Sequence, residues 1–224
     1  MTGEPEDRLI MALPNGRILA EFMPLLRGIG VEPEPAFEDP GSRRLRFATS
    51  DPRLDIIRVR SFDAATFVAF GAAQFGVAGN DVLMEFDYSE IYAPLDLDIG
   101  HCRIAVAATA DWVGRQDDTR PSHVRVATKY PEITRRHFAA RGIQAECIKL
   151  NGAIELAPRL GLCRHIVDLV QTGATLKANG LVEIERIAEV SSRLIVNRPA
   201  LKTQPEEVGG WIERLRTAVD MSRR

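Results

Sequence analysis

The stretch that decides the fold is Ile-Val-Asp-Leu-Val-Gln-Thr-Gly-Ala-Thr-Leu, residues 166–176. Its apolar first half, Ile166 to Val170, predicts a buried strand, and residues 175–178 predict the opening of a helix. Gly173 lies between them and allows the backbone to turn tightly and to approach a ligand closely. A strand, a short turn and a helix in this order predict one βα unit of an α/β protein.

The same stretch has the chemistry of a phosphate site. A helix N-terminus has unpaired N–H groups and a partial positive charge, and Thr172 and Thr175 can add hydroxyl donors. Asp168 lies near the strand end, where α/β sheets bind ligands. The alternative is an ordinary strand–turn–helix in which Thr172 caps the helix, and spacing alone does not separate the two. The Gly-Lys-Ser/Thr ending of a Walker A loop is absent.

Strands and helices alternate on both sides of this stretch, and the pattern restarts after Pro94. The alternation predicts βαβ units and largely parallel sheets. Asp81 is placed to cap one helix, and Thr203 and Glu206 have capping-box spacing before the last amphipathic helix. The predicted strands are 9–13, 55–60, 75–78, 103–108, 124–128, 143–150, 166–170 and 194–196, the main predicted helices are 64–70, 131–141 and 155–160, and 114–122 is predicted to be an exposed loop.

Composition limits the classes of protein that fit. The 224 residues suit one large or two small domains, and the hydrophobic fraction of 45% allows a sizeable core. A formal net charge of −2 with interspersed acids and bases argues against a nucleic-acid surface. Cys102, Cys147 and Cys163 form neither a disulfide framework nor a zinc pair, so a reducing cytoplasm is expected.

Targeting and metal signals are missing from the sequence. Residues 2–7 are acidic and contain proline, unlike a secretory signal, and no apolar run approaches the ~20 residues of a membrane helix. His101, His123, His137 and His165 share no metal-like spacing, so we predict no protein-held metal site.

Many blocks of this sequence follow a known order and spacing, which is far more specific than any one motif. The blocks are 13–14 with 16–17, 42–45, 59–60 with Asp63, 76–79 with 81–85, 125–129, 149–158 with 161–162, 168–181 and 191–197. Through these blocks the sequence resembles the catalytic subunit of the ATP phosphoribosyltransferases over nearly its whole length, from about Leu9 to Val219.

The resemblance implies an α/β, two-lobed fold like that of type II periplasmic binding proteins, with a central cleft. The first lobe would hold residues 1–96 plus 188–224 on the ATP side. The second would hold residues 97–187 on the phosphoribosyl pyrophosphate side. The activity implied is transfer of the phosphoribosyl group to N1 of the ATP adenine, with pyrophosphate leaving, as the first step of histidine biosynthesis.

Site residues follow from the same resemblance. The segment from Asp168 would hold the 5-phosphate of phosphoribosyl pyrophosphate, and Glu155 and Asp168 would meet ribose hydroxyls or magnesium. A solvated acid at a helix start is the alternative for Glu155, and a structural cap acceptor is the alternative for Asp168. The implied phosphate contacts are Thr172, Gly173, Ala174, Thr175 and Leu176, and the implied substrate contacts in the first lobe are Gly16, Arg17 and Asp81.

Arginines and Mg²⁺ would supply the electrostatic help that such a transfer needs, because two polyanions share one site. Arg60 and Arg43 match family arginines that line the cleft, and Arg17 is a further candidate; a surface ion pair is the alternative for each. The family pattern is broken at Asn15 and Asn80, where lysine is usual, at Gln74, where aspartate is usual, and at Arg164, often aspartate.

A short-form member would depend on a separate regulatory subunit that resembles a histidyl-tRNA synthetase, in a hetero-octamer. We expect this chain to resemble the short form, with no regulatory domain after the last predicted helix. Competing interpretations are a non-catalytic small-anion binding protein of the same fold and an inactive paralogue, which the Asn15 and Asn80 departures favour.

Overall fold

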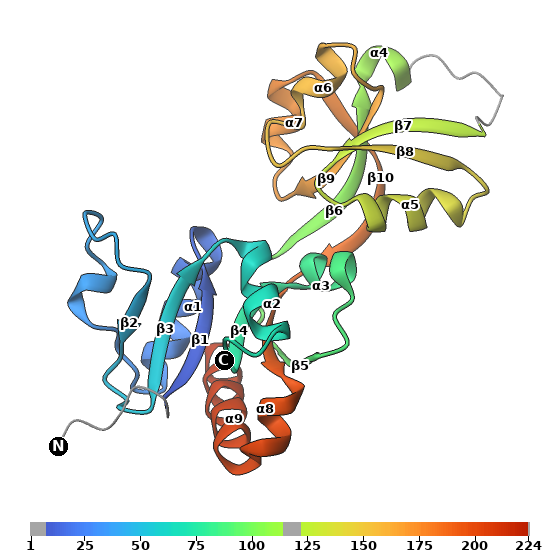
Figure 1. The fold of residues 1–224 in the computed structure, drawn as a ribbon. Helices are drawn as coiled ribbons and strands as arrows, with labels where there is room; N and C mark the ends of the chain where they lie inside the picture. The colour runs from blue at the N-terminus through green and yellow to red at the C-terminus, as the bar shows by residue number, and fades with distance from the viewer. Residues whose placement is uncertain (1–7, 114–121, 224) are drawn as a thin grey trace. The chain divides into compact units, whose positions relative to one another are not determined.

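The computed structural model describes residues 8–113 and 122–223. The chain divides into two compact units (Figure 1). One holds the residues through Leu83, Asp87–Gly100 and those from Ser191 onward, and the other holds Met84–Phe86 and His101–Val190. The loop predicted over 114–122 lies outside the described residues except for Ser122. Among the described residues, no helix has the length and apolar composition needed to cross a bilayer.

The first unit is built on a six-stranded sheet with the order β2-β3-β1-β4-β11-β5. Strand β1 is parallel to β3 and β4, but β11 is antiparallel to β4 and β5, and β2 is antiparallel to β3. The prediction of a largely parallel sheet is therefore wrong, because edge and returning strands make it mixed. The strands are β1 (Leu9–Pro14), β2 (Arg46–Ala48), β3 (Leu54–Val59), β4 (Phe75–Gly79), β5 (Ile91–Asp96) and β11 (Ser192–Asn197).

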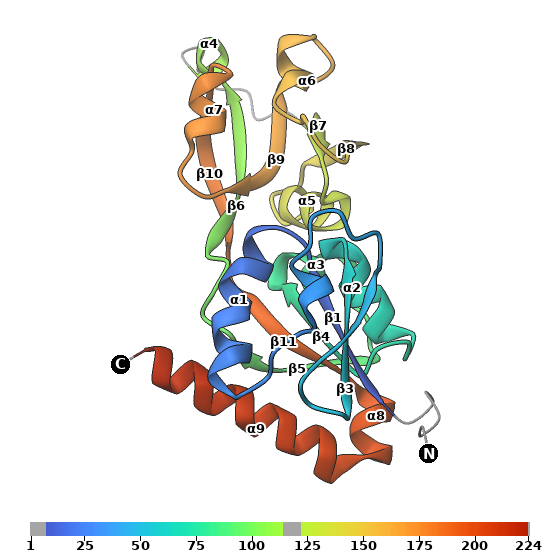
Figure 2. The ribbon, with the colours of Figure 1, turned by 90° about the vertical axis from the view of Figure 1, so that its left-hand side faces the viewer.

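Helices cover both faces of this sheet (Figure 2). On one face, Phe22 of α1 and Trp211 of α9 share a core with Phe75 of β4. On the other, α2 packs through small residues, and a Cβ at Gly76 would lie 2.9 Å from Val68 Cγ2, so glycine is required there. The helices are α1 (Arg17–Gly28), the 3₁₀ turn η2 (Pro35–Phe37), α2 (Ser61–Ala69), α3 (Asn80–Phe86), α8 (Arg198–Thr203) and α9 (Pro205–Ser222).

Two predicted helix caps are wrong. Helix α3 begins two residues earlier than predicted, so Gly79 is its N-cap and Asp81 lies inside the first turn. Thr203 ends α8 instead of capping α9, and its hydroxyl donates to the Pro199 carbonyl. The cause is Pro205, because proline is preorganised for the first helical position and starts a separate helix there.

The second unit is built on a five-stranded mixed sheet with the order β10-β6-β9-β7-β8. Strand β7 is parallel to β8 and β9, whereas β6 is antiparallel to β9 and β10. Helix α5 lies on one face, and α6 and α7 lie on the other (Figure 1). The elements are β6 (Cys102–Thr109), α4 (Ala110–Val113), β7 (His123–Thr128), α5 (Pro131–Ala139), β8 (Gln144–Lys149), α6 (Leu156–Arg159), β9 (His165–Val170), α7 (Ala174–Ala178) and β10 (Leu181–Val190).

Candidate active site

The β9–α7 loop, Gln171–Gly173, forms the sharpest turn of the predicted phosphate segment. Gly173 is the N-cap of α7 with φ 79° and ψ 1°, a left-handed conformation that glycine adopts without strain. The Thr172 hydroxyl accepts from the Ala174 N–H at 3.3 Å. A left-handed residue followed by helical ones directs successive N–H groups toward one point, which is a geometry that binds anions. Thr172, Ala174 and Thr175 are exposed, so a ligand can reach this turn.

Asp168 lies on the same face of the sheet as this turn and its helix. Side chains alternate along β9, so Asp168 shares a face with Ile166 and Val170, which pack against α6 and α7. Its cross-strand neighbour is Ala105, a small residue that leaves space above the strand. Asp168 Oδ1 accepts from the Leu169 N–H at 2.8 Å. The carboxylate is half-buried, and Asp168 lies in β9 shortly before the exposed β9–α7 loop.

Helices α6 and α7 are held by one small core. Leu176 is buried with Ile154 and Ala157, so only its backbone N–H is left to contact a ligand. Glu155 is the N-cap residue of α6 and is half-buried between these core positions. The structure therefore brings Glu155, Asp168 and the β9–α7 loop to one face of the second unit.

An ion pair that the sequence analysis did not predict holds the start of the β9–α7 loop. Arg103 on β6 binds Glu183 on β10 at 2.6 Å and also donates to the Gln171 carbonyl at 3.0 Å. Hydrogen bonding to Arg103 lowers the pKa of Glu183, and the same contact raises the pKa of Arg103. Only the antiparallel order β10-β6-β9 brings the three residues together, so no sequence spacing could have revealed them.

In the first unit, the predicted residues gather at the carboxyl edge of parallel strands. Gly16 and Arg17 follow β1, Arg60 follows β3, and Asp81 follows β4. The Asn15 N–H donates to the Val59 carbonyl at 3.0 Å, which ties the ends of β1 and β3 together. This is the edge at which α/β sheets bind ligands.

The arginines at this edge differ in how they are engaged. Arg17 pairs with Glu21 at 3.1 Å and donates to the Gly100 carbonyl, so part of its charge is used within the unit. Arg43 and Arg60 are exposed, and neither forms an ion pair with another described residue. The Arg58 N–H donates to the Leu45 carbonyl. Because β2 and β3 are antiparallel, this hydrogen bond places the segment with Arg43 beside the end of β3 that Arg60 follows.

Two of the positions that depart from the family pattern have structural partners. Asn80 Oδ1 accepts from the Ser191 N–H at 3.1 Å, and Gln74 Oε1 accepts from the Ile10 N–H at 2.8 Å. Asn80 thus ties the start of α3 to the start of β11, and Gln74 joins β4 to β1. Asp81 is 5% exposed, which leaves little of it for a ligand.

Within residues 8–113 and 122–223, no three His, Cys, Asp or Glu side chains gather in a way that could hold a metal ion.

Comparison with known proteins identifies the family of this chain. A family model described as ATP phosphoribosyltransferase matches residues 60–217. An ATP phosphoribosyltransferase of Paramagnetospirillum magneticum is 71% identical over 214 residues, 96% of this chain and 98% of that protein. The chain belongs to the ATP phosphoribosyltransferase family. Another ATP phosphoribosyltransferase, from Rhodospirillum rubrum, is 69% identical over 96% of this chain and 94% of its own length.

Solved structures give the fold of this ATP phosphoribosyltransferase family member. A chain of the ATP phosphoribosyl transferase (HisG:HisZ) complex from Thermotoga maritima superposes with a TM-score of 0.80 at 30% identity, covering 95% of this chain and 99% of that chain. The periplasmic aliphatic sulphonate binding protein SsuA from Escherichia coli matches with a TM-score of 0.57 at 11% identity, covering 97% and 70%. The expected type II periplasmic-binding-protein-like α/β fold is confirmed.

Proposed function

We propose that this chain is a pentosyltransferase that joins phosphoribosyl pyrophosphate to N1 of the adenine of ATP and releases pyrophosphate, the first step of histidine biosynthesis. The observation that carries the proposal is the exposed left-handed turn at Gly173, on the same sheet face as Asp168 and Glu155. Family membership supports the reaction, and the turn supports the place of the sugar phosphate.

The second unit is the proposed phosphoribosyl pyrophosphate side. The 5-phosphate would accept hydrogen bonds from backbone N–H groups between Gly173 and Leu176 and from the hydroxyls of Thr172 and Thr175. Asp168 and Glu155 would then lie toward the ribose hydroxyls. Arg103 and Glu183 act as positioning residues, because they hold the Gln171 carbonyl and so the start of the turn.

The first unit is the proposed ATP side, with Gly16 and Arg17 at the edge that contacts the nucleotide and the buried Asp81 in the first turn of α3 at the same edge. Arg60 and Arg43 would neutralise the departing pyrophosphate, since their guanidinium groups donate in a planar fork and have no carboxylate partner among the described residues. The charges of the leaving group and of ATP are the main obstacle in this reaction, so electrostatic help has more value than a base.

The chemical step needs no general base from the protein. N1 of neutral adenine has a free lone pair, which attacks the anomeric carbon of the ribose while the bond from that carbon to the pyrophosphate oxygen breaks. The electron pair of the broken bond leaves with pyrophosphate, and no proton has to be removed from N1 for attack. The side chains named above orient the reactants and balance charge.

The second unit offers two carboxylates that could bind Mg²⁺ together with the substrate. Mg²⁺ in phosphate-transfer sites usually takes one or two carboxylates together with substrate oxygens. Asp168 and Glu155 are the carboxylates that would serve, with the diphosphate as the other ligand. When bound, Mg²⁺ would offset the charge of the diphosphate.

A regulatory partner is the remaining part of the proposal. The solved relative from Thermotoga maritima is a HisG:HisZ complex, which supports a separate histidyl-tRNA-synthetase-like subunit here. We place the enzyme in the cytoplasm, in a hetero-octamer through which histidine would exert feedback.

A steady-state assay tests the function. We expect formation of the phosphoribosyl–ATP adduct and pyrophosphate from ATP, phosphoribosyl pyrophosphate and Mg²⁺, with a higher rate when the regulatory subunit is added. Absence of turnover under both conditions, with both proteins folded, would leave the anion-binding protein or inactive paralogue as the better description.

A further inference from the structure

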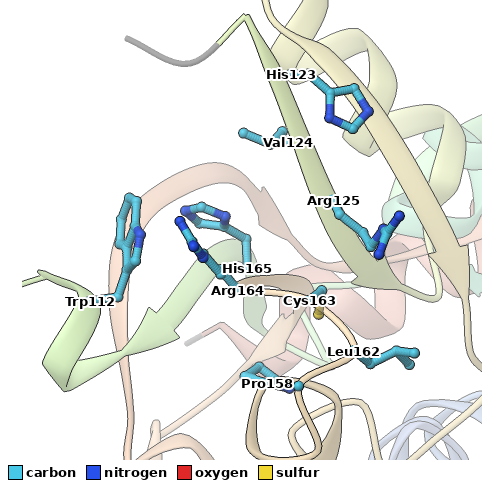
Figure 3. A pocket seen from close by; sticks show the side chains of 10 residues that line it. Trp112, His123, Val124, Arg125, Pro158, Leu162, Cys163, Arg164 and His165 are labelled. Carbon is cyan, nitrogen blue, oxygen red and sulfur yellow. The ribbon is translucent and has the colours of Figure 1, made fainter. Parts of the chain in front are cut away.

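A cavity lies in the second unit, at the end of β9 opposite the β9–α7 loop. Its volume is about 470 Å³, which is within the range of small-molecule sites. Figure 3 shows Trp112, Arg164 and His165 on one side of the cavity and His123 and Arg125 of β7 on the other. Pro158 and Leu162 complete an apolar part of its wall.

The lining of this cavity is cationic and aromatic. None of the ten described residues that line it is acidic. Glu146, which is outside the lining, pairs with Arg125 at 2.8 Å and lies 3.8 Å from His123, so it offsets part of their charge. Arg164 is exposed and forms no ion pair with any described residue.

The aromatic part is preformed. The Trp112 and His165 rings meet edge to face with centroids 4.4 Å apart. Burial, followed by the charge of Arg164, lowers the pKa of His165, so this imidazole is neutral at physiological pH. The positive charge of the cavity therefore comes mainly from Arg164.

The strand separates this cavity from the proposed phosphate site. His165 begins β9 and lines the cavity, whereas the β9–α7 loop follows Val170 at the other end. A six-residue strand spans roughly 20 Å. A ligand in the cavity would not overlap a phosphate held at Gly173.

We propose that this cavity binds a planar aromatic anion, whose ring packs on Trp112 and whose anionic group pairs with the Arg164 guanidinium. Arginine suits this role because its planar fork binds carboxylate or phosphate through paired hydrogen bonds and also stacks on rings. The ligand class is thus an aromatic or heteroaromatic ring that carries carboxylate or phosphate.

Calorimetric titration of the full chain with benzene-1,3,5-tricarboxylate tests the proposal, with propane-1,2,3-tricarboxylate as the non-aromatic comparison. We expect saturable binding of the aromatic anion, and binding of the aliphatic anion weaker by about tenfold or more. Arg164→Ala should weaken binding of the aromatic anion by about tenfold or more. Arg159→Ala is the matched control, an exposed arginine on α6 that does not line the cavity, and should leave the affinity unchanged.

Tryptophan fluorescence locates the bound anion. The chain has two tryptophans, and Trp211 is 4% exposed in the core of the first unit, so quenching by the ligand should come from Trp112 and disappear in Trp112→Phe. Gly173→Val should bind the probe as the wild type does. Equal affinity in wild type and Arg164→Ala, or loss of binding in Gly173→Val alone, would overturn the proposal.

Discussion

Gly173 is the residue whose backbone most directly shapes the proposed phosphate site. Its positive φ turns the chain from β9 into α7, and the Thr172 hydroxyl accepts from the amide that follows. Glycine at this place was predictable from the sequence, because a strand that meets a helix across three polar or small residues needs a permissive hinge. The hydroxyl contact was foreseen only as one of two alternatives, a cap or a phosphate contact.

Gly173→Val should weaken phosphoribosyl pyrophosphate binding by about tenfold or more and leave ATP binding almost unchanged. A β-branched residue at this φ costs about 1–3 kcal/mol, and the N–H groups would turn away from the phosphate. Gly142→Val is the control, since Gly142 has φ 73° in the same unit with no atom near its would-be Cβ. Calorimetry on both variants measures the two affinities, and equal losses for both substrates would contradict the loop assignment.

Arg60→Ala should lower turnover by about 100-fold while changing substrate affinity much less. The proposed role of Arg60 is to meet charge that develops on the departing pyrophosphate, and such donors act most strongly in the transition state. Arg216→Ala, which removes a half-buried arginine of α9 paired with Glu213, is the matched control. Initial-rate kinetics measure turnover and substrate affinity in both variants. Unchanged turnover in Arg60→Ala would contradict the proposed role of Arg60.

At the scale of elements, the Arg103–Glu183 pair links β6 and β10 to the start of the β9–α7 loop. Glu183→Gln should reduce phosphoribosyl pyrophosphate affinity a few-fold and lower stability by about 1 kcal/mol or less, because the pair is partly exposed to solvent. Glu146→Gln, which loosens the Arg125 pair, should leave that affinity unchanged.

The pH dependence of this pair has a definite sign. Arg103 lowers the pKa of folded Glu183 below that of the unfolded chain, about 4.3. The contribution to stability is therefore present above that value and is lost as pH falls through the folded-state pKa. Urea unfolding of wild type and Glu183→Gln should differ at pH 7, and the difference should shrink as the pH falls through the folded-state pKa of Glu183; a difference that stays constant into acid would argue against the ion pair.

Sequence patterns predicted most elements but not their pairing. The apolar runs of β1 and β4 were clear because almost every residue of these two strands is buried, and those of β7 and β9 were clear because most of their residues are buried. The mixed sheets were missed, since local periodicity says nothing about the direction of a neighbouring strand. The same limit hid Arg103 and Glu183, which are 80 residues apart and meet only through strand pairing.

In the whole molecule, ATP is assigned to the first unit and phosphoribosyl pyrophosphate to the second. Hydrogen–deuterium exchange tests this division. Phosphoribosyl pyrophosphate should slow exchange of amides in 171–177, and ATP should slow exchange in segments that follow β1, β3 and β4, near Gly16, Arg60 and Asp81. Protection of the first group by ATP alone would reverse the assignment of the two units.

Family membership accounts for the reaction, but the place of each substrate rests on the geometry of particular residues. The sharpest test is a crystal structure of the enzyme soaked with phosphoribosyl pyrophosphate and Mg²⁺. The account predicts the 5-phosphate within hydrogen-bond distance of the backbone amides from Gly173 to Leu176, with the Thr172 hydroxyl beside it. Density for the sugar phosphate elsewhere, with this turn empty, would contradict it.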